Sequence, residues 1–270
     1  MAPLRWDALV LNDYEAVMPL TWNKKYGIYY LYQPAFTASL GVFGRSVTRE
    51  TVQQMLAAIP KKFRLIEIEL NAGNVFDLPF PLRTNYILDL NKPYESLYAA
   101  YNKNLQRNLK RSEEQLLRFV PDIPVQDVIG IAKKQMADFS NYTDFDFVNF
   151  RKLFSQLHIR GESKAYGVYT DRSELVASAV FFFSHHRAYY ILVGNRTDNR
   201  TTGASHFLID RFIHQHAGKR LLLDFEGSDV NGLANFYSSF GAVEEKYPSI
   251  RVNRLPWLVR LLSGKQPAKT

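Results

Sequence analysis

The stretch that decides the fold runs from Gly194 to Ala242: GNRTDNRTTGASHFLIDRFIHQHAGKRLLLDFEGSDVNGLANFYSSFGA. It begins with the end of a strand and a basic loop, followed by an amphipathic helix over Gly203 to Ala217. A short apolar strand over Leu221 to Phe225 comes next, and then a second helix over Leu233 to Phe240. Gly241 stands where a left-handed residue commonly ends a helix. This alternation predicts a mixed α/β fold.

The loop before the first of these helices has the composition of an anion-binding site. The first N–H groups of a helix lack partners within it, and its dipole is positive at this end. Gly203 leaves room for a pyrophosphate to approach the backbone. A merely capped helix would show the same short motif. The residues expected to bind the donor are Arg196, Arg200, Thr201, Thr202, Gly203, Ala204 and Ser205.

Further strands are predicted on both sides of this stretch. Lys164 to Thr170, Leu175 to Phe183 and Ala188 to Val193 are apolar runs joined by tight polar turns, which predicts an antiparallel meander. Ser249 to Val252 is expected to form a last strand, followed by an apolar helix around Trp257 to Leu262.

The first third of the chain shows a weaker pattern of the same kind. We expect strands over Ala8 to Leu11, Tyr29 to Tyr32 and Arg64 to Leu70, with a turn at Trp22 to Lys25. A helix is predicted over Thr48 to Ile59, because Thr48 is a suitable N-cap and apolar residues then recur at helical spacing.

A long helix with a basic face is predicted over Tyr94 to Phe119, directly after Pro93. Its basic residues fall at i, i+4, i+7 and i+8, and therefore share one face. Such a face suits a phosphate of the acceptor or the acceptor stem of a tRNA, although a solvated helix face is the simpler explanation. The candidate substrate-binding residues are Lys103, Arg107, Lys110 and Arg111.

The chain also contains a faint internal repeat. Phe43 to Asn74 follows the order strand end, basic loop, helix, strand, and Gly194 to Asn231 repeats it. Self-similarity on this scale indicates a duplicated fold. The first copy has the acidic Glu50 near its helix start, where it competes with an anion, whereas the second has Gly203. We therefore expect the second copy to bind phosphate.

The boundary between the two copies is predicted near two prolines. Pro121 and Pro124 interrupt the chain there, and Val125 to Leu157 is expected to supply further helices. The predicted domains are 1–124, a degenerate domain that forms a wall of the acceptor cleft, and 125–270, which carries the donor loop.

Composition narrows the class of protein. A chain of 270 residues suffices for two domains. A net charge of +8 favours an anionic partner, such as a nucleotide-bearing donor, a phosphorylated acceptor, tRNA or an acidic membrane surface, or else keeps the protein soluble. The lack of cysteine excludes disulfides and thiolate chemistry. Without a long apolar run or a signal peptide, we expect a cytoplasmic protein.

The motifs together resemble the core of the GNAT acyltransferases. The resemblance covers Lys164 to Val252. It rests on the meander, the Arg-x-x-Gly-x-Ser loop, the helix after it, the strand sequence LLLDFE and the helix sequence NFYSSFGA. The duplicated layout resembles the FemABX-like branch, which joins two GNAT-like domains and attaches acyl or aminoacyl groups to amines. It implies an α+β fold of two tandem domains, each a mostly antiparallel sheet flanked by helices. Ser205 departs from the family's usual Gly or Ala.

The resemblance also implies catalytic roles. Tyr237 takes the place of a general acid that protonates the thiolate of coenzyme A, although packing against Phe240 would also explain it. The acceptor amine must lose a proton before it attacks. By strand alternation Asp224 and Glu226 share one side, and either would accept that proton, with Glu226 slightly preferred.

Histidine gives no sign of a metal centre. His185 and His186 fall in a predicted turn. His206, His214 and His216 lie on the predicted helix without a spacing that supports zinc. No metal site is predicted.

Three functions remain open on the sequence. The first is an N-acyltransferase that uses acetyl-CoA or another acyl-CoA as co-substrate and an amine as acceptor in an inter-domain cleft, with no tightly bound cofactor. The second uses aminoacyl-tRNA as the donor. The third is a non-catalytic GNAT-fold module that binds RNA or a protein. The glycine loop and Tyr237 favour the first, and the basic helix favours the second.

Overall fold

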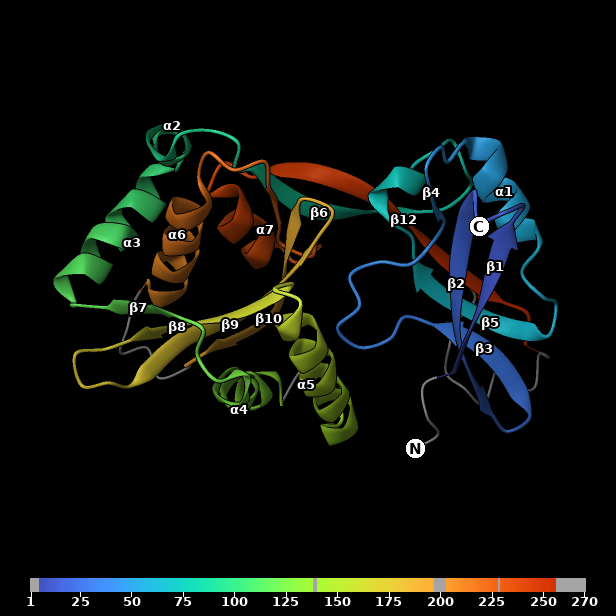
Figure 1. Ribbon diagram of the computed structural model, residues 1–270, viewed down its shortest axis with the longest axis horizontal. Coiled ribbons are helices and arrows are strands. Elements are labelled where there is room, and N and C mark those ends of the chain that lie inside the picture. The colour runs from blue at the N-terminus through green and yellow to red at the C-terminus, as the bar shows by residue number, and fades with distance from the viewer. Residues whose placement is uncertain (1–4, 138–139, 197–202, 228, 256–270) are drawn as a thin grey trace. The chain divides into compact units, whose positions relative to one another are not determined.

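The computed structural model describes residues 5–137, 140–196, 203–227 and 229–255. The chain forms two compact units: unit 1, Met1–Thr84 with Glu245–Thr270, and unit 2, Asn85–Glu244. The described residues form twelve strands and seven α-helices, which confirms the mixed α/β fold (Figure 1). The helix expected around Trp257 to Leu262 falls outside the described residues.

Unit 1 is a sheet with the strand order β1-β2-β3-β5-β12, in which β4 pairs with β2. Its pairs are antiparallel except for β3 with β5. Its elements are β1 (Arg5–Leu11), β2 (Ala16–Lys25), β3 (Ile28–Tyr32), β4 (Phe43–Gly44), α1 (Arg49–Ala57), β5 (Phe63–Glu69), a short 3-10 helix (Ala72–Asn74) and most of β12 (Val243–Asn253).

The core of unit 1 lies between its sheet and α1. Met18 and Leu31 from the sheet and Val52 and Met55 from α1 are all buried in it. As predicted, the Thr48 side chain caps α1 by accepting a hydrogen bond from the N–H of Thr51. Periodic apolar residues and a cap therefore explain the helix.

Unit 2 has the strand order β6-β11-β10-β9-β8-β7, with β10 and β11 parallel and the other pairs antiparallel. Its elements are β6 (Leu82–Asp89), α2 (Tyr94–Ala99), α3 (Lys103–Glu114), β7 (Arg118–Pro121), α4 (Val125–Met136), α5 (Asp144–Ile159), β8 (Ser163–Tyr169), β9 (Leu175–Ser184), β10 (Arg187–Asn195), α6 (Ala204–His216), β11 (Leu222–Asp224) and α7 (Asn231–Ser238).

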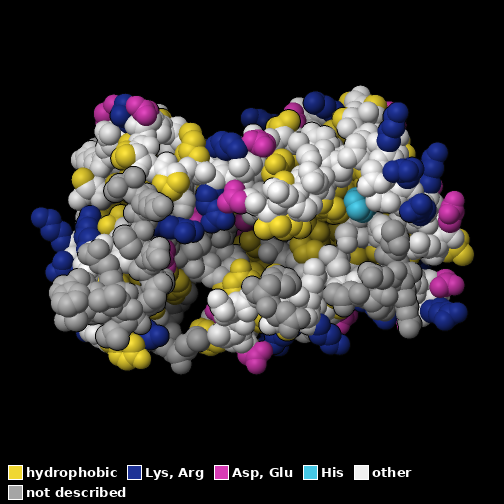
Figure 2. Space-filling model, turned by 180° about the vertical axis from the view of Figure 1, so that it is seen from behind, with side chains coloured by type: hydrophobic (Ala, Val, Ile, Leu, Met, Phe, Trp, Pro, Cys, Tyr) yellow, Lys and Arg dark blue, Asp and Glu magenta, His cyan; other side chains and the backbone are white. Residues whose placement is uncertain are grey.

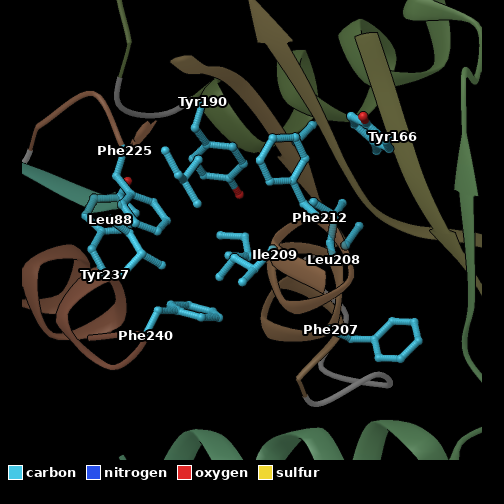
Figure 3. Packing of buried hydrophobic residues seen from close by; sticks show 14 of the residues in the cluster. Leu88, Tyr166, Tyr190, Phe207, Leu208, Ile209, Phe212, Phe225, Tyr237 and Phe240 are labelled. Atoms are coloured by element: carbon cyan, nitrogen blue, oxygen red, sulfur yellow. The ribbon is translucent and has the colours of Figure 1, made fainter. Parts of the chain in front are cut away.

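Helices cover both faces of the sheet of unit 2. In Figure 1, α3, α6 and α7 lie on one face and α4 and α5 on the other. The larger aromatic core is on the α6 side, where Phe181 stacks on Phe212 at 3.9 Å between ring centroids. Figure 3 shows this core, with Phe212 and Ile209 facing Tyr190 and Phe225. Phe225 and Tyr237 both belong to this core.

The two units share one plan, as the internal repeat predicts. In each, the parallel strand pair is joined through a helix: β3 to β5 through α1, and β10 to β11 through α6. A strand antiparallel to β5 or β11 completes the pattern, β12 in unit 1 and β6 in unit 2. The repeat is therefore a property of the fold.

The division into units differs from the predicted boundary after residue 124. Residues 245 to 270 belong to unit 1, because β12 pairs with β5. Residues 85 to 124 belong to unit 2, where β6 pairs with β11 and Leu105 and Leu109 of α3 enter the core. A strand contributed from a distant part of the chain leaves no local signal.

Two local predictions are wrong. Trp22 to Lys25 lies within β2, and the turn follows at Tyr26 and Gly27, whose positive φ angles of 50° and 82° suit a tight hairpin. The helix expected over Tyr94 to Phe119 is divided, because the Asn102 side chain caps a new helix by accepting the N–H of Leu105. The strands β2, β6 and β7 were not predicted.

Candidate active site

The first feature of the site is a buried acidic residue at the end of β11. Asp224 is only 3% exposed. One of its oxygens accepts a hydrogen bond from Arg187 at 2.6 Å, and the other accepts from the Asn85 side chain and from the N–H of Glu226, both at 2.9 Å. Asp224 thus has three partners on three segments of the chain, which suits a structural role.

Asn85 extends this network to the loop after β11. Its side-chain oxygen accepts hydrogen bonds from the N–H groups of Tyr86 and Gly227, both at 2.7 Å. Glu226 and Gly227 have left-handed backbones with φ of 63° and 73°. A left-handed conformation is costly for a glutamate, so the hydrogen bonds of Asn85 and Asp224 are what hold it there.

This loop corrects the predicted geometry of the two acidic residues. β11 ends at Asp224, so strand alternation does not extend to Glu226. The two residues are nevertheless brought together, because the N–H of Glu226 donates to the carboxylate of Asp224. A tight loop, rather than a shared strand face, sets their relationship.

The carboxyl group of Glu226 is buried and incompletely bonded. Its Oε1 atom is buried without a hydrogen-bond partner in the described part of the chain. Burial raises the pKa of Glu226 well above its usual 4.5, the charge of Asp224 raises it further, and Arg187 opposes the shift. Burial raises the pKa of Asp224 as well, but the direct bond to Arg187 makes Asp224 the more readily ionised of the pair.

Tyr237 lies against the same loop. It comes from α7, is 6% exposed, and stacks on Phe225 at 4.6 Å between ring centroids (Figure 3). Burial and then the charge of Glu226 raise its pKa to about 12, so the phenol remains protonated at neutral pH. Tyr86 lies 6.1 Å away between ring centroids. The structure thus places Asp224, Glu226 and Tyr237 near one another.

Two residues of this cluster were missed on the sequence. Asn85 is 139 residues from its partner Asp224, and Arg187 begins β10 directly after a polar turn. Neither belongs to a recognisable motif. The pairing of β10 with β11, which sets Tyr189 opposite Asp224, places Arg187 near that carboxylate.

The predicted donor loop is described only in part. Arg200, Thr201 and Thr202 lie outside the described residues. Gly203 precedes α6 with a left-handed φ of 91°, which few other residues adopt. A Cβ atom on it would lie 2.8 Å from Oγ of Ser112 and 3.0 Å from the carbonyl oxygen of Asn108. Glycine is therefore required here for the packing of α6 against α3, whatever else it does.

The other described loop residues already have protein partners. Arg196 forms an ion pair with Glu174 at 3.3 Å, and the hydroxyl of Ser205 donates to the side-chain oxygen of Asn195 at 2.8 Å. Ala204 is buried in the core. In the first turn of α6 the N–H of Phe207 donates to the carbonyl oxygen of Gly203 at 2.9 Å, whereas the N–H groups of Ala204, Ser205 and His206 make no hydrogen bond to a residue that the structure describes.

The basic residues of α3 lie together, as predicted. Lys103, Arg107, Lys110 and Arg111 are exposed, while Leu105, Leu109 and Ser112 on the opposite side are buried. Gly203 packs against the other side of this helix, at Ser112 and Asn108. Figure 2 shows that Lys and Arg side chains also occur elsewhere on the surface.

The histidines show no metal-like grouping. No cluster of three potential ligands occurs among the residues that the structure describes. His185 and His186 are exposed in a turn, and burial lowers the pKa of both His206 and His216 to about 4. These two partly buried imidazoles are thus neutral at physiological pH.

Comparison with known proteins shows the fold. No family model matches the sequence, and no curated protein matches it. FemX matches with a TM-score of 0.64 at 12% identity, over 96% of this chain and 91% of its own. L-PGS from Bacillus licheniformis matches with a TM-score of 0.57 at 11% identity, over 95% of this chain and 87% of its own.

A third structure agrees with these two. The C-terminal domain of a putative lysylphosphatidylglycerol synthetase from Agrobacterium fabrum matches with a TM-score of 0.51 at 11% identity, over 96% of this chain and 87% of its own. The chain therefore shares with FemX a GNAT-like α+β fold along nearly its whole length.

No described helix has the length and apolar character needed to cross a membrane.

Proposed function

We propose that the chain is a transferase that moves an acyl or aminoacyl group from an activated donor to an amine. The observation that supports this most directly is the meeting of Glu226 and Tyr237 in unit 2. Glu226 supplies a carboxyl group with a buried oxygen that has no hydrogen-bond partner among the described residues, and Tyr237 supplies a buried phenol that keeps its proton. Acyl transfer to an amine needs one group of each kind.

The proposed reaction begins with deprotonation of the acceptor amine. The acceptor arrives as an ammonium group and transfers one proton to the Glu226 carboxylate. Its nitrogen then forms a bond to the carbonyl carbon of the donor, and the bond from that carbon to the leaving sulfur or oxygen breaks. Tyr237 gives its proton to the leaving group, and the second proton of the attacking nitrogen restores the phenol. The products are an amide, the protonated leaving group and one proton on Glu226.

In this scheme Glu226 is the base and Asp224 positions it. Asp224 is committed to Arg187, Asn85 and the backbone of Glu226, whereas one oxygen of Glu226 has no bond in the described part of the chain. Burial raises the pKa of Glu226 above its usual 4.5, and a carboxylate with a raised pKa is a stronger base than an exposed one.

Acyl-CoA is the first candidate donor. The first turn of α6 offers N–H groups with a positive helix end, which suits the pyrophosphate of coenzyme A. Arg196 lies before the same helix, and Arg200, Thr201, Thr202 and Ser205 complete the proposed loop. Coenzyme A would act as a co-substrate that leaves after each turnover.

Aminoacyl-tRNA is the second candidate donor. The four exposed cations of α3 provide contacts for phosphates of an acceptor stem, and the other side of this helix packs on the α6 start at Gly203. One protein of the same fold is named a putative lysylphosphatidylglycerol synthetase, a name that denotes aminoacyl transfer. The cleavage of an ester rather than a thioester would use the same two groups.

Binding separates the two donors. Calorimetric titration with acetyl-CoA and with coenzyme A tests the first, and filter binding of aminoacylated tRNA over a range of salt concentrations tests the second. A tRNA user should show a steep salt dependence that weakens in Lys103→Glu/Lys110→Glu. The matched control Lys134→Glu/Lys152→Glu, at exposed lysines of α4 and α5, makes the same change of charge elsewhere.

The bound donor should then be transferred to a primary amine. Binding without transfer to any amine in a broad screen would favour a non-catalytic module, and the absence of binding by either donor would contradict the proposal.

A further inference from the structure

Several strands of the unit 1 sheet begin or end at the edge where β1 begins. The register places Arg5 opposite Trp22 and Lys25 opposite Ile28, so β2 ends and β3 begins at the same place. Tyr29 pairs with Phe63 at the start of β5, and Asn253 at the end of β12 pairs with Leu65. Five strands therefore present their ends together.

This end carries a concentration of positive charge, which we call the basic end. The Lys and Arg side chains that form it are all exposed, and none of them makes an ion pair with a carboxylate among the described residues. The carboxylate of Asp7, opposite Leu20, lies two pairs further into the sheet than Arg5. The basic end comprises Arg5, Lys24, Lys25, Lys61, Lys62, Arg64 and Arg254.

Three of these cations are held close together by aromatic rings. Arg5 lies 5.2 Å from the ring centroid of Trp22, and Lys62 lies 5.7 Å from the same centroid. Lys24 lies 4.7 Å from the centroid of Tyr29, which Lys62 approaches to 5.7 Å. Like charges crowded over shared rings repel one another. A surface with such charges and no neutralising carboxylate is complementary to a dense array of anions.

Two large rings at the basic end are exposed. Tyr26, in the turn between β2 and β3, is 91% exposed, and Trp6, next to Arg5, is 65% exposed. Tryptophan and tyrosine prefer the boundary between headgroups and acyl chains, where the ring is apolar on one side and its polar atom faces water. Exposed rings among cations are the combination that binds anionic membranes.

We propose that unit 1 docks on an anionic lipid surface through its basic end. The cations contact headgroup phosphates, and Trp6 and Tyr26 enter the interfacial layer. Nucleic acid fits less well, because the rings of Trp22, Tyr29 and Tyr26 each have a cation over one face, where a base would have to stack. The proposal is independent of the transferase function.

Sedimentation with vesicles tests this proposal. The full-length protein should bind vesicles of phosphatidylglycerol and phosphatidylcholine, bind phosphatidylcholine vesicles far more weakly, and be released by salt. Lys24→Glu/Lys25→Glu should weaken binding by at least about 30-fold, since each lost cation contributes roughly fivefold. Trp6→Ser should weaken it at every salt concentration.

The control keeps the net charge equal. Lys134→Glu/Lys152→Glu in unit 2 should bind vesicles like the parent protein, and circular dichroism should show that both double variants are folded. Equal losses in the two double variants would reduce the effect to net charge and overturn the proposal. Failure to bind anionic vesicles would overturn it too, as would binding to single-stranded RNA that depends on Lys24 and Lys25 while vesicles remain unbound.

Discussion

The guanidinium group of Arg187 lies 2.6 Å from the carboxylate of Asp224, where the parallel strands β10 and β11 run side by side. The side chain of Asp224 is 4% exposed and that of Arg187 is 22% exposed. A buried carboxylate depends on such a partner, because removal of the partner leaves an uncompensated charge in the interior. The pair therefore fixes both the end of β11 and the start of the loop that holds Glu226.

Replacement of Arg187 by methionine should destabilise the protein by about 3–5 kcal/mol, because Asp224 remains buried without its cation. Urea denaturation measures this change in the free energy of unfolding. The double variant Arg187→Met/Asp224→Asn should be the more stable of the two, since the amide needs no cation. If the single and double variants are equally unstable, the ion pair does not have the role assigned to it.

Glu226 should make stability fall as pH rises. Its folded-state pKa lies well above the 4.5 of an exposed glutamate, so between these two values the folded protein binds more protons than the unfolded one. Stability from this group is complete below pH 4.5 and is lost as the pH rises through the folded pKa. Glu226→Gln removes the titration, so its stability relative to the parent should increase from pH 4.5 upward. Equal pH profiles for the two proteins would show that the carboxyl group is not buried as described.

Gly203→Ala should destabilise the fold by about 2–4 kcal/mol, because the new methyl group meets Ser112 and Asn108 and the backbone is left-handed. Thermal unfolding measures the loss. Ser112→Ala in the same chain should recover part of it by removing the nearest atom. A variant as stable as the parent would contradict the packing of α6 on α3. Any substitution of Gly203 must therefore be checked for folding before weaker donor binding is interpreted.

His206 should make stability fall as the solution is acidified. Burial lowers its pKa from 6.5 to about 4, so between these values the unfolded chain binds the extra proton. The stability it contributes is complete above pH 6.5 and is lost as the pH falls toward 4. His206→Asn should lose less stability over this window in chemical denaturation, whereas the exposed control His186→Asn should follow the parent. Parallel curves for all three proteins would place His206 in water.

Much of the fold follows from local sequence. The alternating and continuous apolar runs of β8, β9 and β10, the helical spacing in α1 and α6, and the capping Thr48 each predict their elements correctly. The strand β6 has no such local pattern, because its place in the sheet depends on pairing with β11, which lies far along the chain. The return of β12 to unit 1 depends on a similar distant pairing.

The candidate site was predictable only in part. The motif around Glu226 and Tyr237 identifies the two groups proposed for proton transfer, and the structure brings them together. Asn85 and Arg187 were missed, because an amide and a guanidinium that support a loop from other strands carry no pattern of their own. The left-handed backbone of Glu226 could not be predicted either, because nothing in the sequence DFEG marks the end of the apolar strand before it.

The measurement that tests the transferase proposal most directly is the rate of acyl or aminoacyl transfer to an amine by Glu226→Gln, with the free energy of unfolding determined on the same sample. We predict a rate lowered by about 10²–10⁴-fold at neutral pH, because the base is lost, together with stability equal to or above that of the parent. A rate that stays at the parent's value in the folded variant would contradict the role of Glu226 and remove the chemical basis of the proposed function.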